Sequence, residues 1–146
     1  MGIEENKEVV QGYIEEIVNK KQYDKWEQYM SDEFNGNKGA IATKEGHLQY
    51  WDGHRSNMPD LQVEITDIMA EGDRVITIQK WSGHASADGA YRSAEGKYGE
   101  CTHANLYELK DGKIISGGVL VSGALALLQQ YEIILSMEEL AKKLTE

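Results

Sequence analysis

The chain contains a single proline, Pro59, and its hydrophobic pattern changes period at that residue. Before Pro59 the apolar residues recur every three or four positions, which is typical of amphipathic helices. After it, Leu61, Val63 and Ile65 alternate with polar residues, as in a strand with one buried face. Helices followed by a run of strands predict an α+β fold, in which the N-terminal helices pack in a curved antiparallel sheet that forms a cone.

The same patterns predict the individual elements. Helices are expected over residues 4–20, 23–30 and 43–55, and over most of 125–145. Strands are expected over residues 61–66, 74–84, 98–110 and 113–122, and residues 85–97 should form a loop or an extended hairpin tip. No internal repeat or linker interrupts this order, so residues 1–146 are predicted to form one domain.

The net charge of the chain limits the classes of partner that it is expected to bind. A net charge of −10 repels phosphate backbones and anionic lipid, so neither nucleic acid nor a membrane surface is expected as a partner. No apolar run reaches the roughly 18–20 residues of a membrane span, and the N-terminus is too polar for a signal peptide. The single cysteine, Cys101, excludes an internal disulfide. These absences predict a cytoplasmic protein.

Four short motifs follow one another along the chain. They are Met58-Pro59-Asp60-Leu61, Gly83-His84, the stretch from Leu106 to Ile114 with its Asp-Gly-Lys-Ile turn, and Leu127-Leu128-Gln129-Gln130. In order and spacing they resemble the SnoaL-like polyketide cyclases of the nuclear transport factor 2-like superfamily. The resemblance covers roughly residues 7–131. It implies a cone-shaped fold around a small-molecule pocket, and a superfamily that includes isomerases, cyclases, hydrolases, dehydratases and binding proteins without activity.

The resemblance also implies a proton carrier that this chain lacks. In the SnoaL-like cyclases an acidic residue shortly after the Asp-Gly-Lys-Ile turn acts as general acid and base. The corresponding stretch here, 116–122, contains no carboxylate, and Val119 lies near the expected position. A histidine on the preceding strand of the family falls near Asn105. Residues 116–126 are small or apolar, as in a pocket opened for an apolar ligand, either by divergence or by redesign of a natural scaffold.

The third predicted strand carries other reactive groups. Cys101, His103, Asn105 and Tyr107 occupy alternate positions and therefore share one face. If that face lines the pocket, a thiol can become a nucleophile, with His103, or His84 of the neighbouring strand, as its base. Backbone amides, or Asn105 and Tyr107, would then stabilise the oxyanion. The plainer alternative is that the cysteine is a small buried hydrophobe and that His103 is a hydrogen-bonded core or rim residue.

The third predicted helix adds two more histidines. His47, Trp51 and His54 lie on one helical face, so either histidine could reach the pocket mouth or instead face solvent. Tyr13, Trp51, Trp81 and Val119 are further expected pocket residues. The histidines and the cysteine show no metal-type spacing, so neither a metal nor another cofactor is expected.

Three functions remain open at this point. The first is hydrolysis of an activated ester or similar small apolar carbonyl compound by a cysteine–histidine nucleophile. The second is cyclase or isomerase chemistry in which a histidine replaces the missing carboxylate. The third is ligand binding without a reaction. A homodimer is also expected, because sheets of this fold often pair through their exposed face and the apolar tail 131–135 needs cover.

Overall fold

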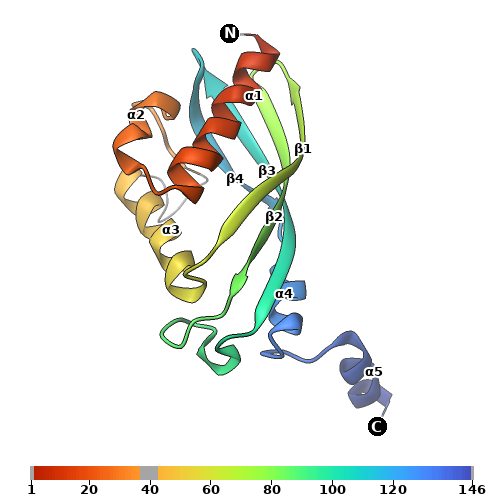
Figure 1. The fold of residues 1–146 in the computed structure, drawn as a ribbon. Helices are drawn as coiled ribbons and strands as arrows, with labels where there is room; N and C mark the ends of the chain where they lie inside the picture. Colours follow the sequence, from red (N-terminus) through yellow and green to blue (C-terminus); the bar gives the residue numbers. More distant parts are fainter. Residues whose placement is uncertain (1, 37–42, 146) are drawn as a thin grey trace.

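The computed structural model describes residues 2–36 and 43–145, and its N-terminal helices precede its sheet (Figure 1). The helical half comprises α1 (Ile3–Gly12), η1 (Tyr13–Asn19), η2 (Tyr23–Lys25), α2 (Trp26–Tyr29) and α3 (Lys44–Asn57). The second half comprises β1 (Gln62–Glu71), β2 (Arg74–His84), the short turn η4 (Arg92–Ala94), β3 (Tyr98–Lys110), β4 (Lys113–Val121), α4 (Ala124–Gln130) and α5 (Met137–Thr145). The predicted α+β class is confirmed.

The sheet is an antiparallel meander in the order β1-β2-β3-β4. Its first strand continues to Glu71, five residues past the predicted end, because a bulge between Ile65 and Asp67 shifts the side-chain alternation by one residue. Two further irregularities interrupt the pairing of β3 with β4, beside Asn105 and beside Leu109. Bulges increase the local twist, which helps the long strands to curve around the helices.

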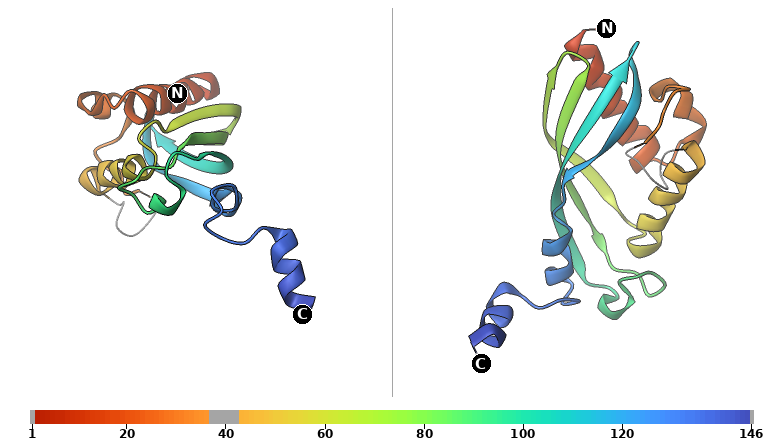
Figure 2. Two further views of the ribbon diagram at one scale, coloured as in Figure 1. Left: turned by 60° about the horizontal axis from the view of Figure 1, so that its bottom comes forward. Right: turned by 180° about the vertical axis from the view of Figure 1, so that it is seen from behind.

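The first predicted helix is present as α1 and η1, which continue into each other without a break. It lies across the concave face of the sheet (Figure 1, Figure 2). Its last part is π-helical, and a hydrogen bond from Lys20 N to Glu15 O closes one of the wider turns. Within η1, Tyr13, Ile14, Ile17 and Val18 are all buried, so this segment supplies the inner wall of the cone.

The C-terminal segment divides into two parts. Helix α4 packs on β3, where Gly99 leaves room for Leu127 and Tyr131, and the Tyr131 hydroxyl donates to Gly83 O over 2.8 Å. Glu132, with a φ of 60°, then breaks the predicted helix. Helix α5 has no buried residue and projects away from the sheet (Figure 2). None of the described helices combines the length and the apolar character needed to cross a membrane.

Candidate functional site

A cavity of about 170 Å³ lies between the concave face of the sheet, η1 and α3. Its walls are formed by Tyr13, His47, Tyr50, Trp51, Gln79, Trp81, Asn105, Tyr107, Gly117, Gly118 and Val119. An engineered apolar cavity of roughly 150 Å³ is known to hold benzene, so this one has room for about one ring. The predicted pocket residues Tyr13, Trp51, Trp81, Asn105, Tyr107 and Val119 all line it.

The alternation of β2 and β3 directs the polar groups inward. Cys101, His103, Asn105 and Tyr107 share the inner face of β3, as their spacing predicts, and none is more than 6% exposed. On β2 the residues Thr77, Gln79 and Trp81 face the same way, because they pair with Asn105, His103 and Cys101. The two central strands therefore present one continuous polar strip to the interior.

The glycines of β4 create the space into which Tyr107 fits. A Cβ atom on Gly117 would lie 2.5 Å from Cδ1 of Tyr107, which pairs with it across the strands. Gly118 lines the cavity directly, and Val119 pairs with Asn105. The two glycines thus make room at the cavity wall, as glycines inside a strand often do.

His47, Tyr13 and Trp51 form a hydrogen-bonded group on the opposite wall. The Tyr13 hydroxyl lies 2.5 Å from His47 Nε2, and Trp51 Nε1 lies 2.9 Å from that hydroxyl and 3.1 Å from Nε2. An indole N–H can only donate, so His47 Nε2 accepts and the neutral ring carries its proton on Nδ1. Burial lowers the pKa of His47 to about 4, which keeps the imidazole neutral at physiological pH.

The structure corrects one expectation for His47. Its side chain is only 6% exposed, so it neither faces solvent nor lies at the pocket mouth but is part of the cavity wall. Its contacts with Trp26 and Phe34, whose ring centroids lie 5.4 and 5.2 Å away, account for this depth. Helical periodicity identifies the face of a helix but not how far other aromatic rings cover it.

A second hydrogen-bonded group centres on Gln79, which the sequence analysis did not single out. Its Nε2 donates to Thr77 Oγ1 over 2.8 Å and to the Tyr107 hydroxyl over 2.9 Å, and its Oε1 accepts from Trp81 Nε1 over 3.0 Å. The available signal was its place between Thr77 and Trp81 at an inward position of a predicted strand. Tyr50, also missed, lines the cavity one turn along α3 from His47.

Cys101 and His103 are in contact but not arranged for nucleophilic attack. The Sγ atom lies 3.4 Å from His103 Nε2, and His103 Nδ1 accepts from the backbone N–H of Gly123 over 3.1 Å. The neutral ring therefore carries its proton on Nε2, so it cannot take the proton of the thiol there. Burial raises the pKa of Cys101 to about 11 and lowers that of His103. Neither residue is among those that line the cavity.

The two remaining candidate histidines lie elsewhere. His84 is at the outer end of β2, where its Nδ1 lies 2.6 Å from Asp60 Oδ2 and its ring lies against Tyr98. It faces away from Cys101, because the two positions fall on opposite faces of the sheet, so the structure does not bring this pair together. His54 packs against Tyr50 and Trp81 behind the cavity wall, and burial lowers its pKa to about 4.

Two buried donors on the cavity wall have no hydrogen-bond partner in the described part of the chain. They are Asn105 Nδ2 and His47 Nδ1. Such atoms are costly unless a ligand or water satisfies them. None of the lining residues is a carboxylate, and no group of three or more His, Cys, Asp or Glu among the described residues could hold a metal ion. The site therefore offers neutral hydrogen-bonding groups in an aromatic frame.

Comparison with known proteins agrees with this architecture. The model of the SnoaL-like polyketide cyclase family matches residues 8–131, which is most of the chain. The chain belongs to this family. No match was found among curated proteins.

Solved structures share the fold at low sequence identity. AclR, a proposed hydroxylase from Streptomyces galilaeus, is 15% identical with a TM-score of 0.75, over 99% of this chain and 91% of that one. TsrD from Streptomyces laurentii is 15% identical with a TM-score of 0.73, over 92% and 99% of the two chains. A SnoaL-like polyketide cyclase from Agrobacterium tumefaciens is 14% identical with a TM-score of 0.73, over 89% and 98%.

This SnoaL-like protein has the family fold, and two residues of its cavity wall differ from what the resemblance implies. The place where the resemblance implies an acid is occupied by Val119, and the place where it implies a histidine is occupied by Asn105. The titratable groups that do line the cavity are His47 of α3 and three tyrosines, Tyr13, Tyr50 and Tyr107.

Proposed function

We propose that this SnoaL-like protein binds a small, mostly apolar carbonyl compound and catalyses proton transfer at the carbon beside its carbonyl group. The observation that carries the proposal is the His47–Tyr13–Trp51 group on the cavity wall, which holds a neutral imidazole against a cavity-lining phenol. Proton abstraction of this kind is the first step of both cyclisation and isomerisation through an enolate. A histidine thus takes the place of the missing carboxylate, although it is His47 and not a histidine of the sheet.

The size and the walls of the cavity support a ligand of about one ring. Trp51 and Trp81 lie with ring centroids 5.1 Å apart and line the cavity together. Flat apolar walls of this kind favour a ring or a short hydrocarbon chain. Asn105 Nδ2, which has no partner among the described residues, supplies a donor for the carbonyl oxygen.

The hydrogen bonds give the proton a route. The Tyr13 oxygen takes the proton from the ligand carbon while its own hydrogen passes to His47 Nε2, and the ligand becomes an enolate. The imidazole is then protonated and Tyr13 is neutral again. Burial raises the pKa of Tyr13 well above its usual value, so the phenol acts only as a relay and the charge moves to the imidazole.

The proposal is tested by deuterium exchange into cyclohexanone in D2O, followed by mass spectrometry. The protein should accelerate incorporation at the carbons beside the carbonyl, and His47→Gln and Tyr13→Phe should each reduce that acceleration by roughly 100-fold or more, the usual contribution of a general base. Cys101→Ala is the matched control and should keep the wild-type rate. Saturable binding of the ketone without exchange above the buffer rate would show a binding protein and overturn the catalytic proposal.

Ester hydrolysis by Cys101 is the second candidate, supported by the 3.4 Å contact between its Sγ and His103 Nε2. The raised thiol pKa and the hydrogen bond that Gly123 donates to His103 Nδ1 both oppose formation of a thiolate–imidazolium pair. The Cys101→Ala variant also distinguishes proton transfer from ester hydrolysis. Hydrolysis of a nitrophenyl ester that disappears in Cys101→Ala would favour the nucleophile over the proton relay.

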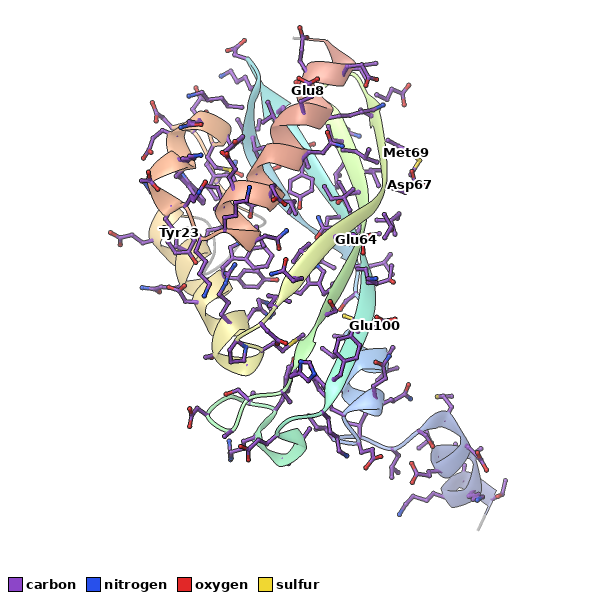
Figure 3. All side chains as sticks on the ribbon, viewed as in Figure 1. Glu8, Tyr23, Glu64, Asp67, Met69 and Glu100 are labelled. Carbon is purple, nitrogen blue, oxygen red and sulfur yellow. The ribbon has the colours of Figure 1, made fainter. Side chains whose placement is uncertain are left out.

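We also propose that the protein forms a homodimer through the outer face of its sheet. That face carries a surface hollow lined by Met69, Ala70, Glu71, Arg74, Ile76 and Leu106. Met69 is 50% exposed on the side of the sheet that faces away from α1 (Figure 3). The tail 131–135 is a weaker reason than the sequence suggests. Tyr131 is buried against β3, and of the apolar residues in the tail only Leu135, at 40%, is exposed.

A further inference from the structure

The orientation of the Gln79 amide is fixed by its neighbours. Trp81 Nε1 can only donate, so the atom that it contacts must be the amide oxygen. The amide nitrogen therefore faces Thr77 and Tyr107, and its two hydrogens go to their two hydroxyl oxygens. Gln79 is 1% exposed and makes a contact through each of its polar atoms, so this arrangement has no ready alternative.

The two cavity tyrosines consequently have different roles. Tyr13 accepts from Trp51 and its hydrogen is directed to His47 Nε2. Tyr107 accepts from Gln79, and the hydroxyl that neighbours its own hydrogen in the described part of the chain, Thr77, already accepts from Gln79. Burial raises the pKa of Tyr107, while hydrogen bonding by the Gln79 amide and the Thr77 hydroxyl acts to lower it. Because Tyr107 lines the cavity, a negatively charged ligand oxygen there competes for this hydrogen better than the neutral Thr77 hydroxyl does.

Asn105 offers a second donor to the same cavity. It precedes Tyr107 by two residues on the inner face of β3, lines the same cavity, and has an unpartnered Nδ2. The closely packed ring of Tyr107 is held in place by Gly117, so the hydroxyl is not free to move away. The inner face of β3 therefore offers a phenol hydrogen and an amide hydrogen to a cavity whose lining contains no carboxylate.

We propose that Tyr107, held by Gln79, and Asn105 together bind a ligand oxygen that carries negative charge, so that the cavity selects the anionic form of single-ring phenols and enols. The inference rests on the proposed function in one respect, namely that the cavity accepts a ligand of one ring. Tyr107 is the ligand-binding residue and Gln79 is a positioning residue that acts through it. Hydrogen bonds to a charged oxygen are about twice as strong as those to a neutral one, which is the source of the selectivity.

Two probes of the same shape separate ring binding from oxygen binding. The first is 4-nitrophenol, whose anion absorbs visible light, and the second is nitrobenzene, which lacks the phenolic oxygen. The wild-type protein should bind both, and the apparent pKa of bound 4-nitrophenol should lie below that of the free compound. In Tyr107→Phe the affinity for the nitrophenolate anion should fall about tenfold and the bound pKa should rise by about one unit, because one pKa unit corresponds to a factor of ten. Affinity for nitrobenzene should stay unchanged.

Gln79→Met tests the positioning role. It keeps the side-chain length and removes both donors, so the bound pKa of 4-nitrophenol should rise as in Tyr107→Phe, with nitrobenzene affinity retained. If this variant does not fold, Thr77→Val removes the other group that lowers the pKa of Tyr107 while Gln79 and Trp81 remain paired. Tyr131→Phe is the matched control, since it loses a buried tyrosine hydroxyl outside the cavity and should leave both affinities unchanged.

The results that would contradict this inference differ from the result that would contradict the proposed function. If wild type binds both probes equally and the bound pKa equals the free one, or if Tyr107→Phe and Gln79→Met behave as wild type, the inference about Tyr107 and Gln79 is overturned and the cavity remains a ligand site. If neither probe binds, the proposed function loses its single-ring ligand and this inference falls with it. Loss of nitrobenzene binding in Tyr107→Phe would show that the residue only supports the fold of the cavity.

Discussion

At the scale of single residues, the site is defined by groups that can only donate hydrogen bonds. The indole of Trp51 sets the tautomer of His47, the indole of Trp81 sets the amide of Gln79, and the backbone N–H of Gly123 sets the tautomer of His103. The first arrangement leaves a basic nitrogen in contact with a cavity phenol, whereas the third removes the base that Cys101 would need. Whether a histidine can act as a base therefore depends more on its hydrogen-bond partners than on its distance from a nucleophile.

The buried His47 should make stability depend on pH. Its pKa is about 4 in the folded state and about 6.5 when unfolded, so the unfolded chain binds more protons between these values. The stabilisation is fully present above pH ~6.5 and is lost on acidification towards pH ~4, by about 3 kcal/mol in total at 1.36 kcal/mol for each pKa unit. Urea unfolding of wild type and of His47→Gln, followed from pH 7 to pH 4, measures the difference.

The carboxylates and His54 contribute equally to the pH dependence of stability in wild type and in His47→Gln. Only the difference between the two proteins in the slope of unfolding free energy against pH is therefore informative. The wild-type free energy of unfolding should fall more steeply with decreasing pH than that of His47→Gln. Parallel curves for the two proteins would show that His47 is protonated as easily in the folded state as in the unfolded one, and that its imidazole is not buried as described.

At the scale of elements, strand alternation predicted the inner face of β3 correctly but could not predict the full length of β1. The bulge at Ile65–Asp67 reverses the alternation, so Ile68 and Ala70 read as out of phase with Leu61, Val63 and Ile65. The sequence also could not predict which side chains hydrogen-bond to each other, such as Gln79 and Tyr107. The register between β2 and β3 depends on the loop that joins them, and the spacing alone left that register open.

Two glycine substitutions test how the elements are joined. On α3, a Cβ at Gly53 meets nothing within 4 Å, so Gly53→Ala should stabilise the protein by up to about 1 kcal/mol through helix propensity. Between β4 and α4, a Cβ at Gly123 would lie 2.2 Å from Thr102 O. Gly123→Ala should therefore destabilise by about 1–3 kcal/mol, the usual cost of overpacking. Chemical denaturation of both variants measures the two changes.

For Gly53→Ala and Gly123→Ala, the direction of the change in the free energy of unfolding matters more than its size. Gly123 has a φ of −91°, which alanine adopts without strain, so any loss of stability there comes from the contact with β3 alone. Equal and small effects of both substitutions would indicate that α4 is not held against Thr102, and that His103 lacks the backbone donor that fixes its tautomer.

At the scale of the whole molecule, a net charge of −10 opposes the proposed dimer, whereas Met69, Ile76 and Leu106 in the hollow of the outer face favour it. Glu64, Asp67 and Glu100 lie along the sheet together with Met69 (Figure 3). Salt shortens the range of this repulsion to about 10 Å at 0.1 M. The fold and its order of layers were predictable from the pattern along the chain, whereas the balance between apolar contact and charge repulsion depends on which side chains the strands bring to one surface.

We expect the fraction of dimer to rise between 20 mM and 500 mM salt, as measured by light scattering on a sizing column. Ile76→Lys, in the hollow of the outer face, should give a monomer at every salt concentration. Leu144→Lys introduces the same charge on the exposed side of α5 and should leave the association unchanged. A monomer in the wild type at both salt concentrations, or a dimer that is lost only in Leu144→Lys, would contradict the proposed interface.

The contact between Gly117 and Tyr107 has a consequence for how this protein can evolve. Every substitution of Gly117 adds a Cβ atom at 2.5 Å from the tyrosine ring, so no single change at that position is tolerated while the ring stays where it is. A smaller residue at position 107 has to come first, and it gives up the cavity hydroxyl. The two positions are therefore expected to change together between descendants, and any lineage that replaces the glycine will have passed through an ancestor with a different ligand preference.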